Sequence, residues 1–111
     1  MKVKQETQWE EFTPADDDFE WVRWGETPEI SGKVVEVTFG DNDNEEDNGY
    51  LLLETDEGLF RTGLGYWDLG RRIVGLDPKK GDQVRIVNEG IFHKPGFKRP
   101  MRQFRVYIRR Q

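Results

Sequence analysis

Aromatic rings and cations alternate in one segment near the carboxyl end, Phe92-His93-Lys94-Pro95-Gly96-Phe97-Lys98-Arg99-Pro100-Met101-Arg102. Rings of this kind can stack on nucleic-acid bases, a contact worth ~1–3 kcal/mol per base. Lys and Arg can contact phosphates, with an attraction that weakens as salt rises. The segment therefore indicates a surface for a polyanion that carries stackable rings. The alternative is that Phe92 and Phe97 close the core while the cations keep the surface soluble.

A second candidate surface falls on a predicted hairpin. Strand alternation places Tyr50, Leu52 and Arg61 on one face and four other residues on the opposite face: Leu51, Leu53, Phe60 and Thr62. An exposed Leu52 beside Tyr50 would be unusual unless something covers it. A shift of one residue in the register would exchange the two faces.

Groups suited to catalysis or metal binding are sparse. His93 is the only histidine, Ser31 is the only serine, and the chain has no cysteine. The loop 41–47 carries carboxylates at alternate positions, but Glu46 and Leu52 stand where an EF-hand calcium loop requires glycine and glutamate. We therefore expect no enzyme activity, no bound metal and no cofactor.

Opposite charges divide the chain. Residues 1–60 contain 4 Lys and Arg against 18 Asp and Glu, a net charge of −14, whereas residues 61–111 contain 13 against 4, a net charge of +9. The basic half suits a polyanionic partner. The acidic half would repel that partner, compete with it or serve a different one.

The first 20 residues are interpreted as an acidic, aromatic arm ahead of one domain at 21–111. The arm carries Trp9 and Phe12 among clustered carboxylates, without a helical or strand period. It could lie over a basic groove in place of DNA, or it could bind a partner protein through Trp9 and Phe12. We expect the aromatic residues that follow to pack against the domain: Phe19, Trp21 and Trp24.

Composition also bounds the cellular setting. The absence of cysteine is compatible with a reducing compartment. No apolar run approaches the length of a membrane span, and the first residues lack the apolar core of a signal peptide. We therefore expect a soluble, cytoplasmic protein.

Alternating hydrophobic residues between turn signals predict five strands, at 30–39, 50–54, 59–64, 83–88 or 83–92, and 101–109. In the first strand we expect Val35, Val37 and Phe39 on one face, opposite Val34, Glu36 and Thr38. In the last strand we expect Phe104, Val106 and Ile108 to share one face.

A change of period between the third and fourth strands predicts a short helix. Tyr66, Leu69, Ile73 and Leu76 are spaced by three and four residues, which places them on one helical face. We expect the neighbouring Trp67 to pack in the core.

Five strands with a helix between the third and fourth is the element order of the OB-fold, a partly open Greek-key barrel. Several motifs strengthen the likeness: Ile-Ser-Gly-Lys-Val-Val-Glu at 30–36, the hairpin 50–61, Lys-Gly-Asp-Gln-Val-Arg-Ile at 80–86 and Asn-Glu-Gly at 88–90. Over about residues 24–109 the chain resembles the small OB-fold proteins of phages and bacteria that are thought to bind single-stranded DNA.

This resemblance implies binding of single-stranded DNA, or RNA, with little sequence specificity, in DNA replication, recombination or repair. The expected contact residues are Tyr50, Arg61, Phe92, His93, Lys94, Phe97, Lys98, Arg99, Arg102, Arg105 and Tyr107.

Two other functions remain open. A protein-interaction module could use the acidic arm to bind a replication or repair protein, or a second copy, and would lose its dimer when residues 1–18 are deleted. An acidic DNA mimic would occupy another protein's DNA site, and that function needs a continuous acidic surface.

Overall fold

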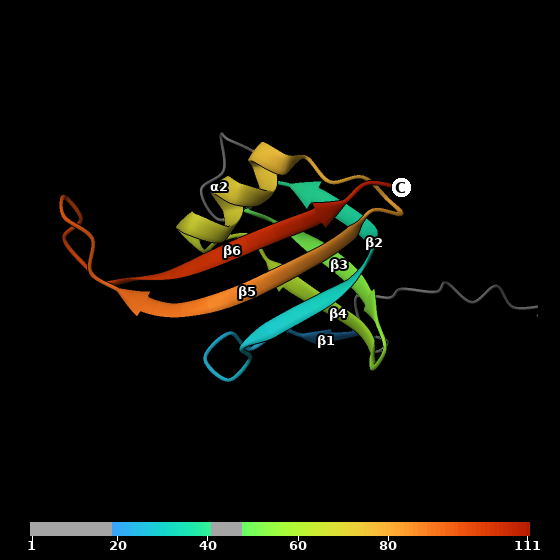
Figure 1. Cartoon of the computed structure of the whole chain (residues 1–111), viewed down its shortest axis with the longest axis horizontal. Helices are drawn as coiled ribbons and strands as arrows, with labels where there is room; N and C mark the ends of the chain where they lie inside the picture. Colours follow the sequence, from blue (N-terminus) through green and yellow to red (C-terminus); the bar gives the residue numbers. More distant parts are fainter. Residues whose placement is uncertain (1–18, 41–47) are drawn as a thin grey trace, which may run out of the picture.

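One twisted sheet with a single helix packed against it makes up the described part of the chain, residues 19–40 and 48–111 of a computed structural model (Figure 1). The elements in chain order are β1 (Phe19–Trp21), β2 (Glu29–Phe39), β3 (Gly49–Thr55), β4 (Gly58–Gly63), α2 (Trp67–Leu76), β5 (Gln83–Phe92) and β6 (Met101–Arg109). The sheet order is β1-β4-β3-β2-β5-β6, with β1 parallel to β4 and the other pairs antiparallel.

A mostly β structure with a helix between β4 and β5 confirms the predicted class, but the predicted five-stranded barrel needs two corrections. The sheet has six strands, and among the described residues no ladder joins its edge strands β1 and β6, so the sheet is open. The extra strand β1 crosses the boundary predicted between the arm and the domain. It pairs with the edge of β4, the edge to which another strand would have to pair to close the sheet into a barrel.

The strand β2 holds the two halves of the sheet together. Its first half pairs with β5 and its second half with β3, and Lys33 has a partner in both. The register shifts between Val34 and Glu36, which makes Val35 the extra residue of a bulge. A Cβ on Gly32 would overlap the carbonyl oxygen of Glu54, so glycine permits this close approach of β2 and β3.

The bulge explains why the predicted faces of β2 are only partly correct. Ile30 and Val34 are buried in the core, and Val37 packs against the same core after the bulge has switched the alternation. Val35 lies at the switch, and Phe39 is 40% exposed at the strand end. After the bulge the regular register keeps Val37 and Phe39 on one face, as predicted, but Val34 shares the core face and does not group with Glu36 and Thr38.

The core lies between the concave face of the sheet and α2. It consists of Trp24, Ile30, Val34, Leu51, Leu53, Leu64, Leu69, Ile73, Val84, Ile86 and Phe104. Trp24 is 1% exposed; its ring meets Phe104 edge-on with centroids 5.1 Å apart, and its Nε1 donates to Thr62 Oγ1 at 2.9 Å. This packing confirms the prediction for Trp24, whereas Trp21 is 55% exposed and does not join the core, so the prediction is wrong for Trp21.

The helix α2 buries Leu69 and Ile73, as its residue spacing predicted. Trp67 is instead 52% exposed, so its assignment to the core is wrong. It is the first residue of α2 and its ring contacts the β5–β6 loop rather than the sheet. No helix of the described residues has the length and apolar character that a membrane crossing needs.

Candidate nucleic-acid interface

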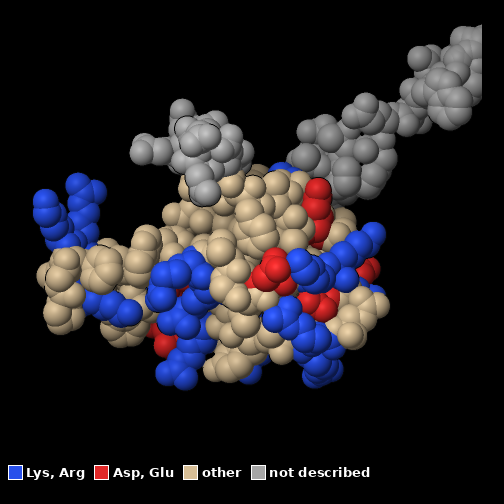
Figure 2. Space-filling view, turned by 90° about the horizontal axis from the view of Figure 1, so that it is seen from above, with Lys and Arg blue, Asp and Glu red and all other residues tan. Residues whose placement is uncertain are grey.

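The described residues carry a net positive charge, although the whole chain is acidic. Counted over 19–40 and 48–111, they contain 15 Lys and Arg against 11 Asp and Glu, a net charge of +4. Beyond Glu89 the chain contains no further Asp or Glu, but seven Lys and Arg. Figure 2 shows Lys and Arg side chains (blue) at the end of the protruding hairpin and across the middle of one face, whereas blue and red side chains lie together at the opposite end.

The central hairpin presents Tyr50 and Arg61 on its outer face, the face turned away from the core. The β3–β4 register pairs Leu52 with Arg61 and Leu51 with Thr62, which confirms the predicted separation of the two faces. Leu52 is only 2% exposed, so it does not form the exposed apolar surface that was considered for it.

Three aromatic rings surround the guanidinium group of Arg61. Its carbon lies 3.6 Å from the ring centroid of Tyr50, 4.6 Å from that of Phe19 and 5.3 Å from that of Trp21. All three distances fall within the range of cation–π attraction. We call this group the Arg61 cluster. Trp21 remains 55% exposed, and Arg61 Nε is buried without a hydrogen-bond partner.

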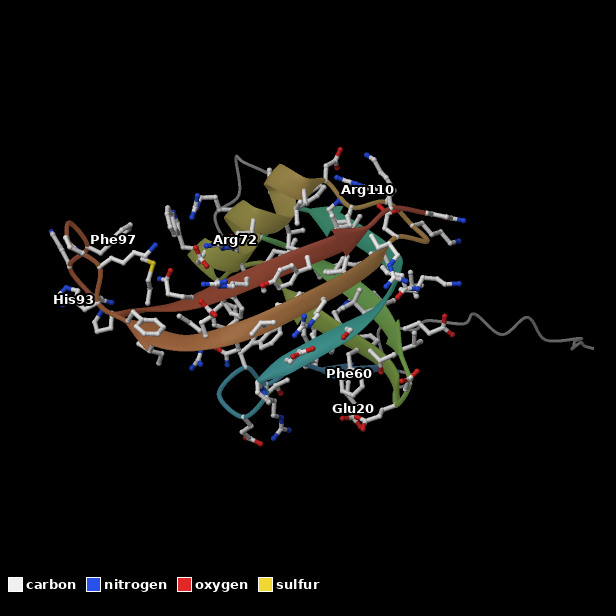
Figure 3. The ribbon with its side chains drawn as sticks, viewed as in Figure 1. Glu20, Phe60, Arg72, His93, Phe97 and Arg110 are labelled. Carbon is white, nitrogen blue, oxygen red and sulfur yellow. The ribbon has the colours of Figure 1, made fainter. Side chains whose placement is uncertain are left out.

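The strands β5 and β6 form a long hairpin that extends beyond the rest of the sheet (Figure 1). Figure 3 shows His93 and Phe97 at its far end. His93 Nε2 lies 2.9 Å from the carbonyl oxygen of Phe97, a contact that braces the loop. The Phe97 ring meets Trp67 edge-on at 5.4 Å, and the guanidinium of Arg71 lies 4.7 Å from the Trp67 ring centroid. The loop is therefore supported by the start of α2.

Phe92, Arg105 and Tyr107 lie on the outer face of the β5–β6 hairpin. Phe92 is 51% exposed and Tyr107 is 47% exposed, so Phe92 does not close the core. Arg105 Nε forms an ion pair with Glu89 Oε1 at 3.1 Å. Arg102 lies on the other face and donates to Asn88 Oδ1 at 3.3 Å.

Four cations near the tip of the β5–β6 hairpin differ in ion pairing from two cations at the opposite end of the sheet. Within the described residues, no carboxylate forms a salt bridge with Lys94, Lys98, Arg99 or Arg102. At the opposite end, Lys79 pairs with Asp77 at 2.9 Å and Arg110 pairs with Asp82 at 3.5 Å. Of these two groups, the hairpin cations are the better placed to contact an external anion.

A buried carboxylate, Asp68, fixes α2 against β6. Its Oδ2 accepts from the Phe104 backbone N–H at 2.8 Å and from Arg72 Nε at 2.9 Å, and its Oδ1 accepts from Arg71 at 3.2 Å. Burial by itself raises the pKa of this carboxyl, but the bonds from Phe104, Arg72 and Arg71 outweigh it and hold the pKa below its ordinary value. Asp68 thus positions two arginines beside the hairpin.

The variant Asp68→Asn should lower the free energy of unfolding by about 1–3 kcal/mol at neutral pH, because it turns amide hydrogens toward arginine donors. The pKa of Asp68 is lower in the folded state than in the unfolded state, where it is about 4. The stabilisation of the fold by Asp68 is therefore complete above the unfolded-state pKa and is lost as the pH falls through the folded-state pKa. Urea titrations at neutral pH and near pH 3 should therefore show the difference from wild type shrinking in acid. An equal difference at both pH values would contradict this role.

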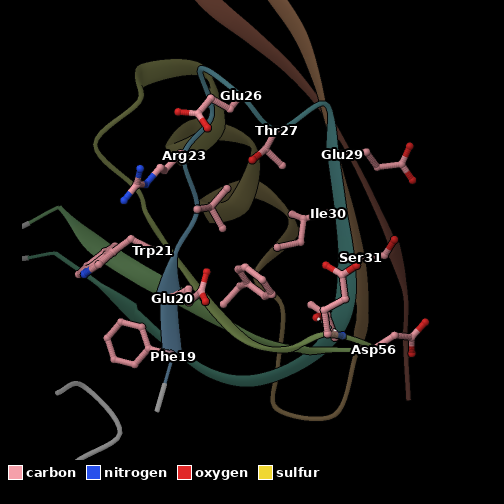
Figure 4. Close-up of a pocket in the computed structure, with 14 residues that line it drawn as sticks. Phe19, Glu20, Trp21, Arg23, Glu26, Thr27, Glu29, Ile30, Ser31 and Asp56 are labelled. Atoms are coloured by element: carbon pink, nitrogen blue, oxygen red, sulfur yellow. Dashed lines mark hydrogen bonds between the residues drawn. The ribbon is translucent and has the colours of Figure 1, made fainter. Parts of the chain in front are cut away.

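A cavity beside β1 has the wrong charge for a nucleic acid. It measures about 770 Å³ and lies between β1 and the start of β2 (Figure 4), with the carboxylates Glu20, Glu26, Glu29, Asp56 and Glu57 in its lining against one cation, Arg23. Glu20 points from β1 toward this cavity, while Phe19 and Trp21 point to the other side of β1. The cavity would repel phosphate.

The predicted residues fall into two groups that the structure describes. Tyr50 and Arg61 contact each other, and the remaining nine lie along β5, β6 and their loop. Trp9, Phe12 and the loop 41–47 lie outside the described residues. Sequence reasoning missed Trp67, Arg71 and the rings of β1 as neighbours of these groups.

The described residues contain no group of three or more His, Cys, Asp or Glu side chains placed to hold a metal ion. Comparisons with protein-family models, with curated proteins and with solved structures found no match to this chain.

Proposed function

We propose that this protein binds single-stranded nucleic acid, DNA in the first instance, with little sequence specificity and without catalysis. The observation that carries the proposal is the β5–β6 hairpin. It holds four cations without a salt bridge to any described carboxylate, together with the exposed Phe92 ring and the Phe97–Trp67 contact. Such a surface combines phosphate attraction with stacking.

The Arg61 cluster would supply a second contact region. Trp21 offers an exposed ring, and the Arg61 guanidinium is a planar group that can stack as well as pair with phosphate. Rings of this kind can stack only on bases that are not already paired within a duplex. They accept every base because each base has a π-face, which explains the low specificity.

The path of the chain supports the same proposal. The five longer strands, β2 to β6, carry α2 between the third and fourth, as in an OB-fold. OB-folds bind oligonucleotides on the face of their second and third strands and on neighbouring loops. In this chain those strands are β3 and β4, which carry Tyr50 and Arg61.

A titration with oligo-dT at about 50 mM salt, followed by tryptophan fluorescence, tests the proposal. Oligo-dT should bind more tightly than a duplex of equal length, and binding should weaken as salt rises. Trp21→Ala should reduce affinity about tenfold, since a lost stacking contact of ~1.4 kcal/mol corresponds to that factor. No binding at tens of micromolar protein, or binding that is insensitive to salt, would refute the proposal.

The control variant is Val74→Ala. Val74 is 60% exposed, similar to Trp21, but it lies on α2 and contributes no ring. It should bind oligo-dT as the wild type does. A loss of affinity equal to that of Trp21→Ala would mean that the effect is not caused by stacking.

A further inference from the structure

A second cavity lies along the hairpin and has a different lining from the acidic one. It measures about 670 Å³, and its lining includes Phe92, Gln103 and Tyr107 together with the cations Arg72, Lys94 and Arg105. This volume is within the range of small-ligand sites. The one carboxylate in the lining, Glu89, is already paired with Arg105 at 3.1 Å. The cavity is therefore basic and partly aromatic.

Gln103 gives this cavity a polar group without a partner. The residue is 7% exposed, and its Nε2 is buried with no hydrogen-bond partner. Buried polar groups in proteins are nearly always hydrogen-bonded, so an orphan donor in a cavity wall calls for an explanation. A ligand that accepts a hydrogen bond would provide one.

The opposite strand leaves room beside Gln103. Its cross-strand partner is Gly90, which follows the bulge at Glu89 and adopts a φ of +100°, a conformation that L side chains rarely adopt. A Cβ at Gly90 would come within 3.9 Å of Phe92 Cε2, so the Phe92 ring stands over this bare position. The ring face and the amide thus border the same space.

The cations of the cavity are held in two ways. Arg72 is anchored by buried Asp68, whose Oδ2 lies 2.9 Å from Arg72 Nε. Lys94 has no salt bridge to a described carboxylate. A fixed guanidinium and an available ammonium are suited to the oxygens of a phosphate.

We propose that this cavity binds one nucleotide of the single strand, an inference that rests on the proposed function. The base lies against Phe92 or Tyr107 and accepts a hydrogen bond from Gln103 Nε2, while Arg72 and Lys94 contact its phosphate. The Gln103 side chain has both a hydrogen-bond donor and an acceptor, and the edge of every base also has both. The site can therefore bind any base. Nε2 is covered in the structure, so side chains around it must turn aside, a common change on binding.

The test replaces the amide with an apolar side chain of similar length, Gln103→Met, in the full chain. Because the amide has no partner in the protein, Tm should stay equal to that of the wild type or rise. Affinity for oligo-dT should fall about five- to tenfold, the effect of one hydrogen bond. The matched control is Gln83→Met at the exposed start of β5, which should leave both quantities unchanged.

A second measurement uses the wild-type chain. The Gln103 side-chain amide resonance should shift on titration with oligo-dT, but not with thymidine monophosphate at the same nucleotide concentration. An equal shift with the free nucleotide would overturn the assignment to a strand.

The remaining outcomes separate the two proposals. Wild-type affinity in Gln103→Met, with or without a lower Tm, would overturn the nucleotide site and leave single-strand binding standing. No binding of oligo-dT by the wild-type chain would overturn both.

Discussion

Replacing Lys94, Lys98 and Arg99 together by Ser should weaken oligo-dT binding on the order of 100-fold at about 50 mM salt. Each phosphate contact on a single strand contributes a slope of about −0.7 to the logarithm of affinity against the logarithm of salt concentration. Losing three contacts should therefore reduce the magnitude of the slope by about 2. The salt-dependent titration measures both quantities.

The matched control removes the same charge elsewhere, in the triple replacement of Lys33, Lys79 and Lys80 by Ser. These lysines are exposed, as Lys98 is, but they lie in β2 and in the turn before β5. This variant should keep the wild-type slope and most of the affinity. Equal losses in both triple variants would show that overall charge, and not the hairpin, attracts the ligand.

The largest expected effect on stability comes from Trp24→Ala. The Trp24 ring is 1% exposed and contacts Phe104, and the substitution leaves a cavity between the sheet and the segment before β2. We expect a loss of about 3–5 kcal/mol in the free energy of unfolding, measured by chemical denaturation. If that variant is unfolded, the smaller change Trp24→Phe still tests the packing.

Trp67→Ala is the control because its ring is 52% exposed. Its removal should cost about 1 kcal/mol or less, as is usual for substitutions at the surface. Similar losses for the two tryptophans would contradict the contrast between a core residue and a surface ring.

Local patterns were sufficient for the regular elements of this fold. The strand β6 occupies the predicted residues 101–109, and the two faces of β3 and β4 follow from strict alternation. The helix also lies close to its predicted residues, because the spacing of Leu69 and Ile73 is a local property. The same spacing could have placed Trp67 correctly, because Trp67 is not one of the residues that define the apolar face of the helix.

Features set by tertiary pairing could not be predicted. The run Val34-Val35-Glu36-Val37 fits either alternation, and the bulge depends on β2 serving two partner strands. The strand β1 has only three residues and depends on the edge of β4. The Arg61 cluster shares this origin, since Phe19 and Trp21 reach Arg61 only through that parallel pairing.

A map of backbone amide shifts during titration with oligo-dT tests the central claim most directly. We predict that the largest shifts fall on Trp21, Tyr50 and Arg61, on the start of α2, and on the hairpin from Phe92 to Arg102. The acidic cavity around Glu26 and Asp56 should remain unchanged. Shifts confined to that cavity or to the turn at Lys79, or no shifts at all, would contradict the account.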